Sequence, residues 1–259
     1  MKRLKLMLVF GIVFFTAQVL GAQQALTIVR ESRERINVST TQTRSRWIIT
    51  AKNGSTTERL IDQYSKDDAA GLSRVVIVFQ QPASVAGTRF LSMDTGKGGS
   101  NQWIFLPSLG KVRRIAASEG SGSFMGTDFS YDDIASADRK ADLDTHTILR
   151  EESYSGKTCY VIESKPKDNS YQYSKMVQWI DKDSKVPYKV ELYDKKGTHV
   201  KTLEILELKD VQGKLSPMKT RMTTAGGGNT TINFEIIKYD EAIPESVFST
   251  SYLETGKVR

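Results

Sequence analysis

Few residues in this chain could carry out nucleophilic or metal-dependent chemistry. It contains one cysteine, Cys159, and two histidines, His146 and His199. Neither histidine has the spacing of a metal-ligand motif, and their charged or turn-forming neighbours are typical of solvated surface. Cys159 stands in an alternating stretch, 158–163, which favours a small buried residue over a nucleophile. We therefore predict that the chain is not an enzyme and uses no metal or cofactor.

The short polar motifs are better explained by turns and caps than by catalysis. The Gly-Ser-Gly-Ser loop at 120–123 lacks the flanking residues of a nucleophile elbow. The segment 181–184 begins like a calcium loop but lacks the glycine and glutamate that complete one. Asp132 and Asp133 could form an acid–base pair, yet the preceding Ser130 favours a helix N-cap with an acidic first turn.

The N-terminus has the composition of a secretory signal. Three basic residues precede an apolar run over 6–15, and small residues suit cleavage after Ala22. We expect residues 1–22 to be removed on export to the periplasm, an uncleaved anchor being the alternative. Residues 23–259 then form a single domain, and loss of the three basic residues lowers the formal net charge from +7 to about +4.

This charge and the cysteine usage exclude several functional classes. A weak positive charge without a stripe of basic and aromatic residues predicts no nucleic-acid binding. A single cysteine excludes an intrachain disulfide, so the domain depends on its apolar core. The cleavage point has no neighbouring cysteine, and a lipid anchor on a new N-terminal cysteine is therefore excluded.

The apolar pattern predicts one helix followed by a long series of strands. Residues 23–38 have helical spacing, whereas apolar and polar residues alternate from residue 43 onward in short runs separated by turns. We count about ten or eleven strands, with a charged linker between residue 134 and residue 149. The predicted fold class is mainly β (α+β), with one strongly curved antiparallel sheet. Such a sheet must close or be covered, and the helix and the loose segment 117–137 are the candidate covers.

Residues 101–115 are predicted to form a hairpin. With a four-residue turn, Phe105 pairs with Val112 and Trp103 pairs with Arg114. One face of the hairpin then carries these four side chains. We expect that face to point toward the covered side of the sheet as a cavity wall, with Arg114 stacked on Trp103.

A glycine-rich segment follows the hairpin. It carries four large apolar residues: Phe124, Met125, Phe129 and Tyr131. Residues 74–118 hold six basic residues and one acid, and residues 119–142 hold six acids and two basic residues. The two halves could therefore hold each other electrostatically, the alternative being that both are solvated surface. We interpret residues 124–131 as a movable cover that fills an empty site and yields to a ligand.

These runs resemble the signature of the bacterial outer-membrane lipoprotein-sorting protein family. The resemblance rests on QWIFLP at 102–107, KVRRI at 111–115 and SFMGTDFSYDD at 123–133. That family is similar to the LolA/LolB-type periplasmic lipoprotein carriers. The later patterns Trp179-x-Asp181, Pro187-x-Lys189 and Asp194-x-x-Gly197 also resemble the hairpins of that superfamily, so the resemblance spans nearly all of the mature chain.

The resemblance implies an incomplete antiparallel β-barrel whose concave face is covered by helices and holds acyl chains. It implies no catalytic residue. It further implies lipoprotein or lipid cargo, an inner-membrane transporter or other donor complex, and an outer-membrane acceptor. Without a lipidated cysteine, the chain is expected to be a soluble, monomeric periplasmic carrier and not a membrane-anchored acceptor.

We therefore expect an apolar cavity that offsets the cost of carrying an acyl chain through water, about 12 kcal/mol for sixteen carbons. The candidate cavity or cover residues are Trp47, Phe79, Phe90, Trp103, Phe105, Val112, Arg114, Phe124, Met125, Phe129 and Tyr131. The competing interpretation for each is ordinary core packing. The alternative function is a periplasmic sensor of the same fold that binds polypeptide and signals to a membrane protein. A lipid hydrolase has no visible nucleophile–base pair.

Overall fold

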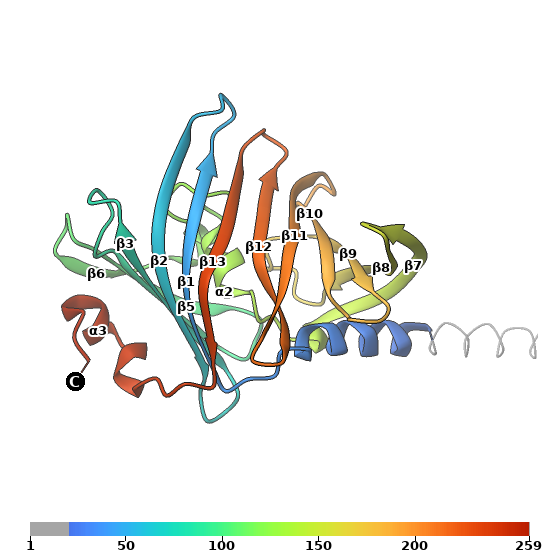
Figure 1. Cartoon of the computed structure of the whole chain (residues 1–259), viewed down its shortest axis with the longest axis horizontal. Coiled ribbons are helices and arrows are strands. Elements are labelled where there is room, and N and C mark those ends of the chain that lie inside the picture. The colour runs from blue at the N-terminus through green and yellow to red at the C-terminus, as the bar shows by residue number, and fades with distance from the viewer. Residues whose placement is uncertain (1–20, 259) are drawn as a thin grey trace, which may run out of the picture.

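The structure is a computed structural model that describes residues 21–258. Among these residues, thirteen strands form one antiparallel sheet, so the expected mainly β class is confirmed and the count of ten or eleven was too low (Figure 1). The strands are β1 (Thr40–Thr50), β2 (Thr56–Asp67), β3 (Ser73–Gln81), β4 (Arg89–Asp94), β5 (Ser100–Leu106), β6 (Lys111–Arg114), β7 (Asp144–Tyr154), β8 (Lys157–Pro166), β9 (Lys175–Asp181), β10 (Pro187–Tyr193), β11 (His199–Val211), β12 (Lys214–Thr224) and β13 (Asn229–Tyr239).

One long connection joins the two edges of the sheet. The chain starts in the middle with β1, meanders outward to the edge strand β6, and returns from the opposite edge, β7, to β13, which pairs with β1. Residues 115–143, here called the crossing segment, therefore run from one edge to the other. They contain η1 (Ala117–Glu119), α2 (Tyr131–Ala135) and η2 (Ala141–Leu143). We call the face that this segment covers the inner face and the opposite one the outer face.

β7 begins earlier than the sequence pattern predicted. Residues 144–148, expected in a charged linker, pair with β8, and Asp144 and His146 are buried there. His146 is 4% exposed, so the expectation of a surface histidine was wrong. Its Nε2 lies 2.9 Å from the carbonyl oxygen of Ala141 and its Nδ1 lies 2.8 Å from the hydroxyl of Ser164. These polar partners explain why apolar alternation gave no signal for this strand.

The N-terminal helix covers the inner face at the β8–β9 end. It spans 21–34 among the described residues, against an expected 23–38. Its apolar stripe, which includes Ile28 and Val29, packs on Ile162 of β8 and Ile180 of β9. The expected signal segment lies, apart from its last two residues, outside the described part. Within residues 21–258, no helix has the length and apolar character needed to cross a bilayer.

The C-terminal helices lie on the other face. η3 (Glu245–Phe248) and α3 (Thr250–Thr255) pack on the outer side of β3 to β6. Phe248 and Leu253 are buried against Val76 and Leu91. Helices were expected on the concave face, and the placement of η3 and α3 on the outer face differs from that expectation. The tail from Ser249 onward thus buries one apolar side of a short helix.

Candidate functional site beneath the crossing segment

The crossing segment presents its apolar residues on a tight turn. Ser123 and Ser130 form an isolated β-bridge, and the Phe124 amide donates to the Phe129 carbonyl at 2.7 Å. The turn is closed by Met125 and Gly126, both in the left-handed region at φ 52° and 78°. Residues 123–130 thereby form a small hairpin that directs Phe124 and Phe129 at the inner face.

Phe124 occupies the centre of an aromatic cluster. Its side chain is fully buried, and its ring centroid lies 5.1 Å from that of Phe90 and 5.8 Å from that of Phe79. Trp47 completes the cluster at 6.3 Å from Phe124 and 5.6 Å from Phe129. Such aromatic pairs contribute about 0.5–1.5 kcal/mol each beyond the burial of area. The cover therefore fills the apolar inner face in this structure.

Asp128 and Asp132 fasten the cover to the sheet. The Asp128 carboxylate accepts hydrogen bonds from the hydroxyls of Thr230 on β13, at 2.7 Å, and Thr224 on β12, at 3.1 Å. Asp132 accepts from the side-chain amide of Gln102 on β5 at 3.0 Å. Burial raises the pKa of the Asp132 carboxyl above its ordinary value.

Asp133 makes the third attachment and also caps α2. Its backbone amide donates to the Ser130 hydroxyl, and its carboxylate accepts from the Ser130 amide at 2.8 Å, which confirms the predicted cap. The same carboxylate pairs with Lys201 of β11 at 2.6 Å and accepts from the hydroxyl of Tyr173 at 2.7 Å. Burial, and then the charge of Asp133, raise the pKa of the Tyr173 hydroxyl.

The predicted attraction between the basic and acidic halves is largely absent. Among the described residues, a single ion pair, Arg113–Glu119 at 3.0 Å, joins residues 74–118 to residues 119–142. The carboxylates that fasten the cover bind hydroxyls, an amide and Lys201, which lies outside the basic half. Net charge over a stretch does not determine which side chains meet.

The structure separates the candidate residues into two groups. Those on the inner face lie in one cluster: Trp47, Phe79, Phe90, Phe124, Met125, Phe129 and Tyr131. The hairpin register was predicted correctly, with Phe105 opposite Val112 and Trp103 opposite Arg114. Its orientation was wrong, because Trp103, Phe105 and Val112 pack with η3 and α3 on the outer face.

Arg114 was expected to stack on Trp103 and does not. Its guanidinium donates to the side-chain oxygen of Asn101, and the cation that lies over an aromatic ring of this hairpin is Arg89, 4.5 Å from the centroid of Phe105. Ile104 and Leu106 are the apolar residues of β5 that face the inner cluster. Sequence reasoning missed further inner-face residues: Ile61, Val75, Ile77, Ile104, Met176, Leu192, Met222 and Ile232. The two-residue spacing of Val75 and Ile77 from Phe79 is the signal that could have found those on β3.

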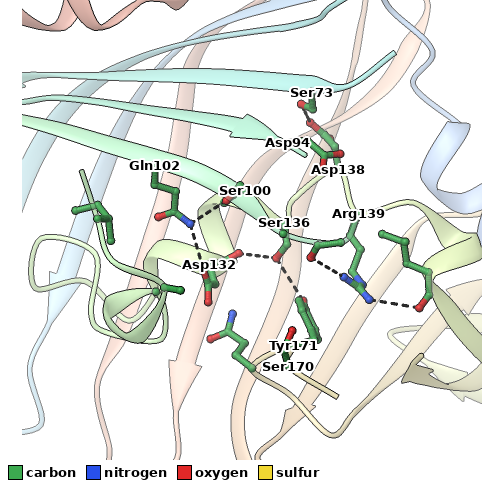
Figure 2. Close-up of a pocket in the computed structure, with 18 of the residues that line it drawn as sticks. Ser73, Asp94, Ser100, Gln102, Asp132, Ser136, Asp138, Arg139, Ser170 and Tyr171 are labelled. Carbon is green, nitrogen blue, oxygen red and sulfur yellow. Dashed lines mark hydrogen bonds between the residues drawn. The ribbon is translucent and has the colours of Figure 1, made fainter. Parts of the chain in front are cut away.

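A cavity lined by both polar and apolar side chains lies beside the aromatic cluster. It has a volume of about 640 Å³. Figure 2 shows Gln102, Asp132, Asp138 and Tyr171 around it. Arg139 also lines it and is neutralised by Asp144 at 2.7 Å. Asp138 is exposed, and its carboxylate accepts from the hydroxyl of Ser73 at 3.0 Å.

The short helix α2 separates this cavity from the aromatic cluster. Tyr131 and Ile134, one turn apart, pack against the cluster. Asp132 and Ala135, also one turn apart, line the cavity.

The chain is similar to several known proteins. A family model described as an uncharacterized protein matches residues 71–255. A Vibrio parahaemolyticus crystal structure, described as an outer membrane lipoprotein-sorting protein domain, is 30% identical with a TM-score of 0.83, covering 90% of this chain and 99% of that one. A DUF1329 family protein from Desulfovibrio piger is 28% identical with a TM-score of 0.85 and the same coverage. A LolA superfamily protein from Nitrosomonas europaea is 22% identical with a TM-score of 0.71, covering 88% and 98%. The curated proteins that we searched contain no match.

Proposed function

The chain belongs to the bacterial outer-membrane lipoprotein-sorting protein family, and we propose that it is a periplasmic carrier that binds acyl chains beneath the crossing segment. In this proposal residues 1–22 are removed on export and residues 23–259 act as one monomeric carrier domain. The cargo is a lipoprotein or another acylated lipid, taken from an inner-membrane donor and delivered to an outer-membrane acceptor.

The observation that carries the proposal is the placement of Phe124. A ring from a connecting segment fills the middle of the inner face, between Phe79, Phe90 and Trp47 of three different strands. If the turn withdraws, these rings offer an apolar surface of the kind that lines lipid-binding sites. An acyl chain placed there makes the contacts that Phe124 makes in the ligand-free protein.

The free energy of burying the apolar side chains of the cover and that of burying an acyl chain in their place are of similar size. Burying Phe124 and Phe129 and partly burying Met125 and Tyr131 contributes up to about 12 kcal/mol, and transferring a sixteen-carbon chain from water contributes about 12 kcal/mol. Replacing the side chains of the cover by an acyl chain therefore changes the free energy little. A carrier needs this balance, since it must both accept and release its cargo.

The cover is held to the sheet by polar contacts, which contacts with water can replace. Asp128, Asp132 and Asp133 hold it through hydrogen bonds and one ion pair. Water can replace these partners when the cover moves away, so the net cost of breaking each hydrogen bond to a carboxylate is about 1.5–3 kcal/mol.

The three tryptophans of the chain provide the test. Trp47 belongs to the inner cluster, whereas Trp103 and Trp179 pack in clusters on the outer face. A fatty acid brominated on its chain quenches tryptophan fluorescence on contact. We expect it to quench a variant that keeps only Trp47 (Trp103→Phe with Trp179→Phe).

The matched control keeps only Trp103 (Trp47→Phe with Trp179→Phe) and is expected to stay bright at the same ligand concentration. Mass spectrometry of protein purified from the periplasm should also find acylated cargo in stoichiometric amount. Equal quenching of both variants, or the absence of both quenching and cargo, would refute the proposal.

A further inference from the structure

Arg59 lies at the edge of the aromatic cluster on the inner face. It stands on β2 directly opposite Trp47 of β1, two residues before the buried Ile61. Its guanidinium carbon lies 5.7 Å from the ring centroid of Phe79, which is itself in contact with Phe124. Gly126, at the tip of the cover, approaches the same guanidinium: a Cβ at that position would lie 3.8 Å from Nη2.

The guanidinium of Arg59 has no anionic partner among residues 21–258. Its Nε and Nη1 are buried and make no hydrogen bond there, and no carboxylate lies within ion-pair distance. Burial lowers the pKa of Arg59, and no neighbouring charge offsets that effect. Leaving a buried donor unpaired is unfavourable, and more so when the group is charged.

Every other arginine of the described chain that is at least partly buried has a hydrogen-bond or ion-pair partner, although Nε of Arg74 and Nε of Arg221 are themselves unpaired. Arg139 pairs with Asp144, Arg74 pairs with Glu245, and Arg221 pairs with Glu204. Arg89 lacks a carboxylate but donates to the backbone carbonyls of Leu253 and Glu254. The unpaired state of Arg59 is therefore specific to the position beneath the tip of the cover.

We propose that Arg59 binds the anionic head, a carboxylate or a phosphate, of an acyl ligand whose chain replaces Phe124. This inference rests on the proposed carrier function and narrows its ligand class. The acyl chain would lie on Phe79 and its neighbours, and the head would meet Nε and Nη1 of Arg59 once the 125–126 tip withdraws. A guanidinium presents paired donors that match the two oxygens of such a head.

The test compares ligands that share a sixteen-carbon chain and differ in their head. Palmitate and a palmitoyl lysophosphatidate are anionic, whereas hexadecanol is neutral. Binding of each is measured by displacement of a fluorescent fatty acid from the wild type, Arg59→Gln and Arg59→Lys. Arg46→Gln is the matched control, because Arg46 lies next to Trp47 on the same strand with its side chain paired to Glu235.

We expect Arg59→Gln to weaken binding of both anionic ligands about 10- to 100-fold and to leave hexadecanol unchanged. Arg59→Lys should be intermediate and Arg46→Gln unchanged. Preference for one anionic ligand identifies the head as carboxylate or phosphate. Inorganic phosphate at the same concentration should not displace the probe, since it lacks the chain.

Two outcomes would overturn this inference but not the carrier function. One is an equal change in affinity for palmitate and hexadecanol, which would mean that Arg59 holds the cover in place. The other is no change in affinity for any ligand. If the wild type bound none of the ligands, the carrier function and this inference would both be overturned. Thermal unfolding of ligand-free Arg59→Gln guards against a folding artefact, and we expect no loss of stability because an unpaired buried charge is removed.

Discussion

The Nζ of Lys201 lies 2.6 Å from Oδ2 of Asp133, and this pair joins the crossing segment to a strand far along the chain. Both side chains are largely buried, with exposures of 16% and 6%. Tyr173 donates to the same carboxylate at 2.7 Å. The pair is an ion-pair attachment of the cover, so a substitution in it tests where the cover lies.

Loss of one partner of this pair should loosen the cover. We expect Asp133→Asn to lower the free energy of unfolding by about 3 kcal/mol, because Lys201 is left buried without its anion. Chemical denaturation measures this loss. The matched control is Glu119→Gln in the same segment, whose ion pair with Arg113 is exposed and should contribute less than about 1 kcal/mol. Equal losses in the two variants would contradict the assignment.

A disulfide across the cover should prevent ligand binding. The Asp128 amide lies 3.0 Å from the hydroxyl oxygen of Thr230, so cysteines at these positions can meet. In a Cys159→Ala background, Asp128→Cys with Thr230→Cys should bind no fatty acid when oxidised. Binding should return on reduction. Full binding by the oxidised protein would show that cargo enters without movement of the cover.

Phe124→Ala should show whether this side chain competes with the ligand or only stabilises the core. The fully buried ring is lost, so the ligand-free protein should lose about 3–5 kcal/mol of stability. The affinity for an acyl chain should rise, because less apolar contact has to be broken on opening. Phe248→Ala on the outer face is the control, and it should lower stability without a change in ligand affinity. The reverse pattern would place the ligand on the outer face.

His146 should make the stability depend on pH. Burial is the main cause that lowers the pKa of its imidazole in the folded protein. The unfolded state therefore binds a proton first, so stability is highest above about pH 6.5 and falls as the pH drops from there toward the lower folded pKa. Denaturation at about pH 8 and about pH 5 measures the difference.

The neutral imidazole fits its hydrogen bonds. Since the Ala141 carbonyl can only accept, Nε2 carries the proton, and Nδ1 accepts from Ser164, whose hydroxyl in turn accepts from Gln178 at 2.8 Å. His146→Gln should reduce the pH dependence in this range. An unchanged slope in the variant would assign the effect to other groups.

Local features were predictable from the sequence where short-range physics decides them. The hairpin register follows from the length of the turn, which places Phe105 opposite Val112. The cap of α2 follows from the three-residue spacing of Ser130 and Asp133. Cys159 is buried as its alternating neighbours indicated. Each of these depends on residues that are close together in the chain.

The sequence by itself determined a mainly β chain with an apolar cover near residue 124. Only the tertiary structure decided which side of each strand that cover meets. Alternation along β5 puts Trp103 and Ile104 on opposite faces, and both are apolar, so the strand alone cannot identify the inner one. Ile104 became inner because the crossing segment spans that side from β6 to β7, and Trp103 became outer because Phe248 returns from the far end of the chain to pack there. Both reasons are long-range contacts, which no local pattern encodes.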